Sequence, residues 1–160
     1  MYEVFGEFNS AKEINEAAKG LLTEGDIENI KVLAKENGIA EDFVEMYVAG
    51  DIEFICDEES AAIGKLDVEM ADIKATEIVT DWVNYIKGCV MKDSNMAITV
   101  KKKGKSLKGC IAKLLKYSFE NMYPVDKDIL KAAGINQQCK LGMPGMATAK
   151  KIIREYYVGK

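Results

Sequence analysis

The residue types that most often carry catalysis or bind metals are sparse in this chain. Its 160 residues contain no histidine, which excludes imidazole acid–base catalysis, Ser-His and Cys-His nucleophile pairs, and histidine metal ligands. The four cysteines are isolated, with no CxxC pair to form half of a zinc site. We therefore expect free thiols, no metal, no cofactor and no enzymatic activity. The cysteines are Cys56, Cys89, Cys110 and Cys139.

Gly104, Lys105 and Ser106 resemble the end of a phosphate-binding loop that opens a helix. The full motif needs another glycine five residues earlier, where the sequence has Thr99, so a nucleotide-binding loop is excluded. The amino terminus of the helix that follows would still attract a phosphate of a nucleic acid or an acidic side chain of a partner, because its backbone amides and the lysines around it favour anions.

The charged residues are distributed unevenly along the chain. Residues 1–90 carry 21 acidic and 7 basic side chains, a net charge of −14, whereas residues 91–160 carry 5 and 15, a net charge of +10. Two interpretations follow. Either the charges of the two halves neutralise each other inside the protein, or the electrostatic field of each half attracts a partner of opposite charge.

The acidic residues are densest in a short segment that follows Ala40. One interpretation is a solvated acidic face, and the other is a surface that attracts a basic protein. Residues 30–47 also have the spacing of a helix-turn-helix, but the second helix offers only acids and would repel DNA phosphates. The candidate residues for binding a partner are Glu41, Asp42, Glu45, Asp51, Glu53, Glu58 and Glu59.

The basic residues are densest between Lys92 and Lys116, and a second group lies near the carboxyl end. There, basic side chains neighbour Tyr156 and Tyr157, an arrangement that can hold single-stranded nucleic acid by stacking. Internal neutralisation and a protein partner remain the alternatives. The candidate residues for nucleic acid or a partner are Lys101, Lys102, Lys103, Lys105, Lys108, Lys113, Lys150, Lys151 and Arg154.

Apolar residues recur at helical spacing through most of the chain, which predicts a mainly α, compact, bundle-like domain of six to eight helices, with room for one short strand pair. Residues 97–100 are β-branched enough for a strand or an extended connection. Gly64 is expected to interrupt or weaken its helix. The sixth helix is expected to turn Leu115 and Phe119 inward. The expected helices cover about 10–25, 26–38, 41–48, 58–70, 75–91, 106–121, 127–133 and a last segment after Gly145.

We expect residues 1–55 to form an acidic helical lobe and residues 56–160 a helical core with a basic carboxy-terminal half, or both to form one continuous domain. The sequence lacks eighteen consecutive uncharged apolar residues, so no membrane contact is expected. Glu3 and Glu7 lie where a signal peptide would have lysines and an apolar run, which favours a cytoplasmic protein.

Three segments of the chain resemble PcfK-like proteins, which are small proteins of conjugative plasmids and integrative elements of Gram-positive bacteria. They are MYEVFGEFNSAKEIN (1–15), KGKSLKGCIAKLLKYSFENMYPVDKDIL (103–130) and KKIIREYY (150–157). The resemblance implies a mobile-element setting, and it carries over no catalytic residues.

Together these features favour a non-enzymatic interaction protein of a bacterial mobile genetic element that binds a protein or nucleoprotein partner. The sharpest version is an anti-defence inhibitor, an anti-CRISPR, whose acidic lobe occupies the Lys- and Arg-lined DNA channel of a Cas effector nuclease. The alternative is a nucleic-acid-binding accessory protein of conjugative transfer that acts through the lysine cluster.

Overall fold

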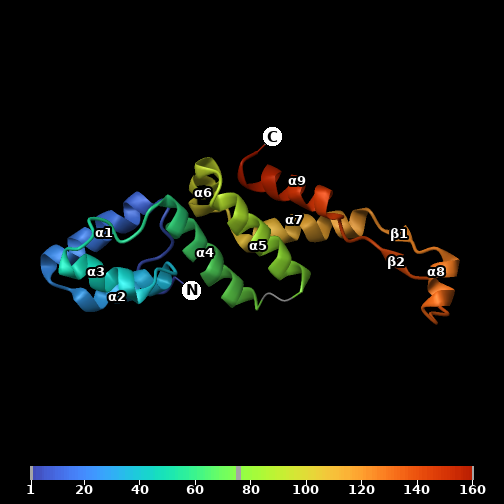
Figure 1. The fold of residues 1–160 in the computed structure, drawn as a ribbon, viewed down its shortest axis with the longest axis horizontal. Coiled ribbons are helices and arrows are strands. Elements are labelled where there is room, and N and C mark those ends of the chain that lie inside the picture. The colour runs from blue at the N-terminus through green and yellow to red at the C-terminus, as the bar shows by residue number, and fades with distance from the viewer. Residues whose placement is uncertain (1, 75–76, 160) are drawn as a thin grey trace. The chain divides into compact units, whose positions relative to one another are not determined.

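The computed structural model describes residues 2–74 and 77–159 and is mainly helical (Figure 1). Within these residues the chain forms nine helices and one two-stranded sheet, which confirms the predicted mainly α fold. Ala75 and Thr76, expected to begin the fifth helix, lie outside the described residues. The helices are α1 Ala11–Glu24, α2 Ile27–Glu36, α3 Glu41–Ala49, α4 Glu58–Ile73, α5 Ile78–Val90, α6 Ser94–Lys101, α7 Leu107–Glu120, α8 Lys127–Ala132 and α9 Met146–Tyr157.

The first two helices begin where local capping residues place them. The Ser10 hydroxyl accepts a hydrogen bond from the Glu13 amide at 3.2 Å, and Asp26 accepts one from the Asn29 amide at 3.1 Å. Glu13 in turn accepts from the backbone amide of Asn9. Each contact satisfies a backbone donor that the helix itself leaves unpaired, so the caps fix where α1 and α2 start.

Residues 97–100 are helical, so the expected strand or extended connection there is wrong. They belong to α6, which Asp93 caps by accepting hydrogen bonds from the amides of Asn95 and Met96. Met96, Ala97 and Val100 are buried, and α6 packs against α4 and α5. Packing against α4 and α5 therefore overrides the strand preference of the β-branched residues. With α6, the described residues form nine helices, one more than the upper limit of the six to eight that the sequence predicts.

The contacts divide the chain into two units between Lys108 and Gly109, rather than at residue 55. In the first unit, α1 packs on α2 and α2 on α3, around a core that includes Ile14, Ile30 and Leu33. The helix α4 packs against α5 and α6 in the same unit. All seven candidate acidic residues, from Glu41 to Glu59, belong to the first unit.

Gly64 lies inside α4 and does not interrupt it, so the expected interruption is wrong. A Cβ atom on Gly64 would lie 2.2 Å from the backbone oxygen of Asn37, and one on Gly38 would lie 2.4 Å from the backbone oxygen of Gly64. Only glycine allows α4 to cross the end of α2 at this distance. The close approach of the two backbones therefore requires a glycine at position 64, although glycine has a low helix propensity.

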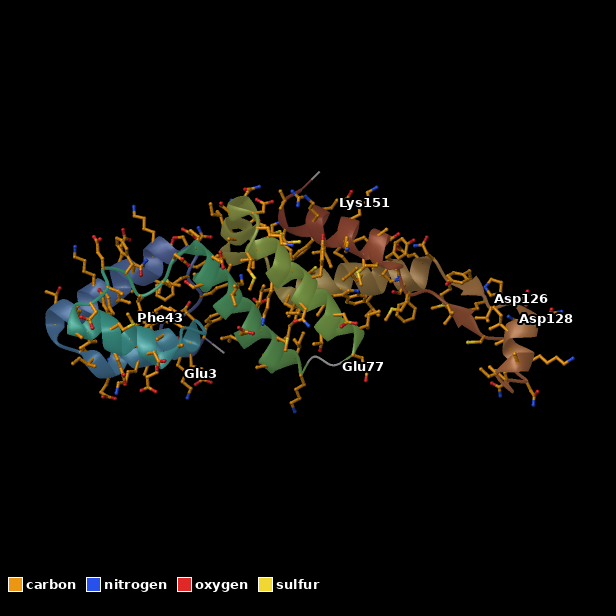
Figure 2. The ribbon with its side chains drawn as sticks, viewed as in Figure 1. Glu3, Phe43, Glu77, Asp126, Asp128 and Lys151 are labelled. Atoms are coloured by element: carbon orange, nitrogen blue, oxygen red, sulfur yellow. The ribbon has the colours of Figure 1, made fainter. Side chains whose placement is uncertain are left out.

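The second unit contains most of α7 and a two-stranded antiparallel ribbon with α8 between its strands (Figure 1). The strands are β1 Tyr123–Pro124 and β2 Lys140–Leu141, with Tyr123 opposite Leu141. Asp126 caps α8, and Figure 2 shows Asp126 and Asp128 at its start. The short strand pair that the sequence allowed is therefore present.

Several large apolar side chains of the second unit are exposed. Phe119 is 67% exposed and Leu115 is also exposed, so the expectation that both face inward from α7 is wrong. Leu114 and Cys110 on the same helix are buried. The buried stripe of α7 is therefore narrower than the sequence indicated.

In the part of the chain that the structure describes, no helix has both the length and the apolar character to cross a bilayer.

Candidate interaction surface

The candidate acidic residues lie on α3, on the loop that follows it and on the first turn of α4. Six of them are exposed, and Glu58 is half-buried. The sequence has no lysine or arginine between Lys35 and Lys65, so this segment contains no cation of its own. Lys31 of α2 approaches Glu41 at 4.0 Å. We call the set Glu41, Asp42, Glu45, Asp51, Glu53, Glu58 and Glu59 the acidic surface.

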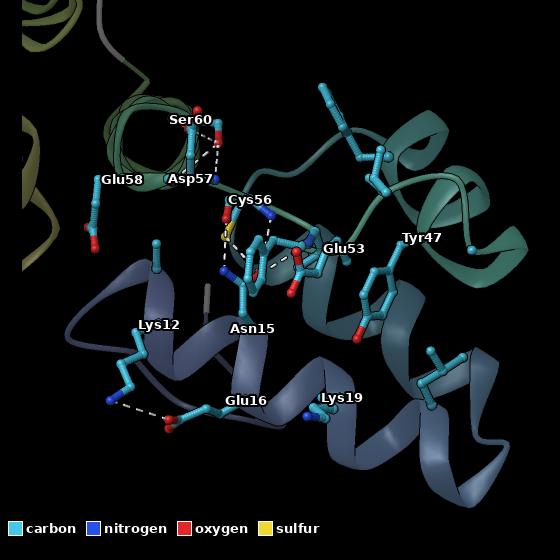
Figure 3. A pocket seen from close by; sticks show the side chains of 17 residues that line it. Lys12, Asn15, Glu16, Lys19, Tyr47, Glu53, Cys56, Asp57, Glu58 and Ser60 are labelled. Atoms are coloured by element: carbon cyan, nitrogen blue, oxygen red, sulfur yellow. Dashed lines mark hydrogen bonds and ion pairs between the residues drawn. The ribbon is translucent and has the colours of Figure 1, made fainter.

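A groove of about 1100 Å³ adjoins the acidic surface (Figure 3). Its walls are α1 on one side and residues 50–58 on the other, and α3 contributes Phe43 and Tyr47. We call it the α1 groove. Phe43 is 48% exposed and Phe54 is 58% exposed, although both line the groove. Two aromatic side chains are therefore open to solvent beside a dense group of carboxylates.

Asn15 fixes the far wall of the α1 groove to α1. Its side-chain oxygen accepts hydrogen bonds from the amides of Ile55 at 3.0 Å and Cys56 at 3.3 Å, and its nitrogen donates to the Cys56 carbonyl at 2.8 Å. Figure 3 shows Asn15 extending from α1 toward Cys56. One side chain thus replaces the backbone pairing that this irregular segment lacks.

The polar groups around the groove have environments that argue against nucleophilic chemistry. Burial raises the pKa of the Cys56 thiol to about 12, so the reactive thiolate is disfavoured at neutral pH. Asp57 caps α4, and its hydrogen bonds from Ser60 lower the pKa of its carboxyl group.

The basic cluster is divided by the fold, and Lys101 does not belong to a surface. It is fully buried, and its ammonium donates to the Asn37 side chain at 3.2 Å. Burial, together with nearby Lys65, lowers the pKa of Lys101 to about 8. Its expected role in nucleic-acid or partner binding is therefore wrong, because no partner can reach it. Lys102, Lys103 and Lys108 are exposed, and Lys105 is half-buried.

Lys65 lies at the centre of a buried polar network in the first unit. Its ammonium donates to Glu7 at 2.6 Å and to the Lys102 carbonyl at 3.0 Å, and it lies 3.8 Å from Glu69. The network joins the amino-terminal segment, α4 and the end of α6. All three charged members of the network come from residues 1–90, so it balances charge within the acidic half of the sequence rather than between the two halves.

The amino terminus of α7, which the sequence suggested for an external anion, is occupied by Glu69. The Glu69 carboxylate accepts a hydrogen bond from the Leu107 amide at 2.6 Å. Burial raises the pKa of Glu69, while this hydrogen bond and Lys65 oppose the rise. Lys108 pairs with Asp72 at 2.7 Å. An acidic group does bind there, but it comes from the same chain.

The basic residues of the second unit remain on its surface. Lys113 on α7 and Lys150, Lys151 and Arg154 on α9 are exposed, and Figure 2 labels Lys151. Tyr157 is buried and meets Tyr156 edge to face, with ring centroids 4.9 Å apart. The expected pair of tyrosines for stacking on bases is therefore not formed, because one ring is inside.

The sequence did not identify the aromatic residues of the α1 groove. Its helical spacing predicts Phe43 on the inner face of its helix, whereas the side chain is half exposed. Phe54 lies between Glu53 and Asp57 in a segment without helical periodicity. An isolated aromatic residue among acids is the feature of the sequence that could have indicated a binding surface here.

In the described ranges, no three Cys, Asp or Glu side chains are placed to hold a metal ion. Comparison with family models, with curated proteins and with solved structures finds no match to this chain. The candidate function therefore rests on the surface itself.

Proposed function

We propose that this protein is a non-enzymatic binding protein whose acidic surface occupies a Lys- and Arg-rich surface of a protein or nucleoprotein partner. The observation that carries the proposal is the cluster of seven acids on α3, its following loop and the start of α4, in a segment without a basic residue. Such a cluster attracts a cationic surface and speeds association with it.

The sharpest form of the proposal places the protein in the cytoplasm of a bacterium as an inhibitor carried by a mobile element. Its partner is then a CRISPR effector nuclease, because the channel that holds DNA in such enzymes is positively charged. The resemblance to PcfK-like proteins supports the mobile-element setting. The buried thiol of Cys56 and the exposed acids agree with inhibition by occupancy rather than by a reaction.

The test adds the protein to a guide-RNA-loaded Cas nuclease and measures cleavage of target DNA. The parent should inhibit, and the triple variant Glu41→Lys, Asp42→Lys, Glu45→Lys should relieve inhibition, more strongly at low salt than at high salt. A matched control, Glu24→Lys, Asp81→Lys, Glu155→Lys, changes the same net charge at exposed sites outside the acidic surface.

Equal inhibition by the parent and the triple variant would show that the acidic surface is not the contact. If no Cas nuclease is inhibited, the proposal that the partner is a Cas nuclease fails. Capture of proteins from a lysate whose nucleic acids have been digested then tests the general proposal of a cationic protein partner. Proteins retained by the parent and the control but lost with the triple variant would then identify the cationic partner.

A second candidate function is binding of nucleic acid by the second unit. The specific observation is that residues 109–160 carry nine basic and four acidic side chains, with Lys113, Lys150 and Lys151 exposed. Binding of labelled single-stranded DNA should weaken steeply with salt. It should be lost in Lys113→Glu, Lys150→Glu, Lys151→Glu and kept in the acidic-surface variant, and no binding at low salt would eliminate this function.

A further inference from the structure

We infer that the α1 groove binds a cationic amphipathic helix of the partner, with apolar side chains against Phe43 and Phe54 and lysines or arginines against the rim. This inference rests on the proposed function and names the element of the partner that makes contact. It adds an apolar, shape-dependent contact to a surface that otherwise acts only through its charge.

The dimensions of the groove suit a helix. Lining residues of α1 extend from Ala11 to Leu22, which is about 16 Å at 1.5 Å per residue. Three turns of a helix span the same length. The volume of about 1100 Å³ lies just above the usual range for small-molecule sites, so a peptide element fills it better than a metabolite would.

Two apolar side chains of the groove, Phe43 and Phe54, lack a cover. Phe43 comes from α3 and Phe54 from the loop, and both expose about half of their surface, whereas Ile52 is half-buried and Ile55 is buried in the lining beside them. Exposed aromatic residues in a concave site are the usual anchors of a helix-in-groove contact. A partner helix with apolar residues at positions i, i+3, i+4 and i+7 would cover them.

The charge of the rim determines the charge of that helix. Glu16, Glu53, Asp57 and Glu58 line the groove, against Lys12 and Lys19. Lys12 is already paired with Glu16 at 3.7 Å. Asp51 and Glu59 are also exposed, and each directly follows or precedes a lining residue in the sequence. An acidic helix would be repelled, whereas lysines and arginines on the flanks of the apolar stripe would be attracted.

The groove is already formed before a partner arrives, because Asn15 holds residues 55–56 against α1 through three hydrogen bonds. Binding therefore does not require the wall to become ordered, which reduces the entropic cost of association.

The probe for this inference is a fluorescein-labelled helical peptide of leucine and lysine, four turns long, with leucine at i, i+3, i+4 and i+7. Two control peptides replace every lysine by glutamate or every leucine by serine. Fluorescence anisotropy with the full chain should show binding of the leucine–lysine peptide alone. Amide chemical shifts should change at residues 11–22 and 50–60.

The double variant Phe43→Ser, Phe54→Ser should weaken peptide binding about tenfold or more. Met91→Ser is the matched control, because Met91 is 58% exposed and lies outside the groove, and it should bind as the parent does. Equal affinity of the double variant and the parent, or shift changes confined to other residues, would overturn the inference.

The failure of this inference differs from failure of the proposed function. If the acidic-surface triple variant abolishes inhibition or capture of the partner while the phenylalanine variant does not, the partner binds through charge alone and the groove is not its site. If neither variant changes binding of the partner, the proposed function itself is wrong.

Discussion

The carboxylate of Glu69 accepts a hydrogen bond at 2.6 Å from the backbone amide of Leu107, and both residues are buried. The contact places a negative charge at the amino terminus of α7, where the helix dipole favours it. It also ties α4 to the end of the segment that follows α6. An anion site suggested by the sequence is thus a structural contact within the first unit.

Replacing Glu69 by alanine should lower the free energy of unfolding of the first unit by about 3 kcal/mol. The change leaves the Leu107 amide without its acceptor and removes one carboxylate from Lys65 inside the protein. Urea unfolding followed by the fluorescence of Trp82, the single tryptophan, measures the effect. Glu45→Ala, at an exposed site on α3, should change the stability by less than about 0.5 kcal/mol. Equal effects of the two substitutions would contradict the structural role.

Two glycine-to-alanine substitutions should change stability in opposite directions. Gly20 in α1 has nothing within 4 Å of the point where an alanine Cβ atom would lie, so Gly20→Ala should stabilise the protein by about 0.5–1 kcal/mol. Gly64→Ala should destabilise it by about 2 kcal/mol or more, because its methyl group would meet the Asn37 oxygen. Thermal unfolding monitored by circular dichroism compares them, and a Gly64→Ala protein as stable as the parent would show that the crossing can relax.

The buried ammonium of Lys101 predicts a specific dependence of stability on pH. Burial lowers its pKa from 10.5 to about 8, so between these values the unfolded chain holds a proton that the folded protein does not. Its contribution to the free energy of unfolding therefore increases as pH rises from 8 to 10.5, by up to about 1.4 kcal/mol per pH unit.

The comparison with Lys101→Met cancels the contribution of Cys110, since burial raises the pKa of this thiol to about 12 and it acts in the opposite direction above pH 9. Burial also raises the pKa of Cys56, which Lys101 lowers, so the difference includes this interaction. The stability of the parent relative to Lys101→Met should rise between about pH 8 and 10. A constant difference across that range would mean that Lys101 titrates normally.

Replacing Asn15 by alanine should loosen the wall of the α1 groove. The change removes an acceptor for the amides of Ile55 and Cys56, and we expect a loss of about 2 kcal/mol in stability. Hydrogen exchange should become faster at residues 51–56 and stay unchanged in α5. Unchanged exchange at these residues would show that the wall is held by its apolar contacts.

The sequence predicts the beginnings of α1 and α2 well because the information is local. Ser10 and Asp26 cap helices through residues only three positions away, so the pattern is visible in a short window. The role of Gly64 is not visible in this way, because it depends on Asn37, a residue at the end of another helix. Local propensity describes a glycine in a helix only as a weakness.

The candidate site shows the same limit. The exposure of Glu41, Asp42 and Glu45 follows from their charge, but the burial of Lys101 depends on distant residues such as Asn37, which accepts a hydrogen bond from its ammonium. The α1 groove forms through Asn15 and Cys56, which are 41 residues apart. Contacts over such separations cannot be read from periodicity or composition.

The absence of lysine and arginine between Lys35 and Lys65 also determines how a complex can be mapped. Trypsin would release residues 36–65 as one 30-residue peptide that contains the whole acidic surface. Amine-reactive cross-linkers have no target within residues 36–64. Carbodiimide coupling joins carboxylates directly to the amines of a neighbouring protein, so it would label this peptide with the lysines of the partner that lie against it.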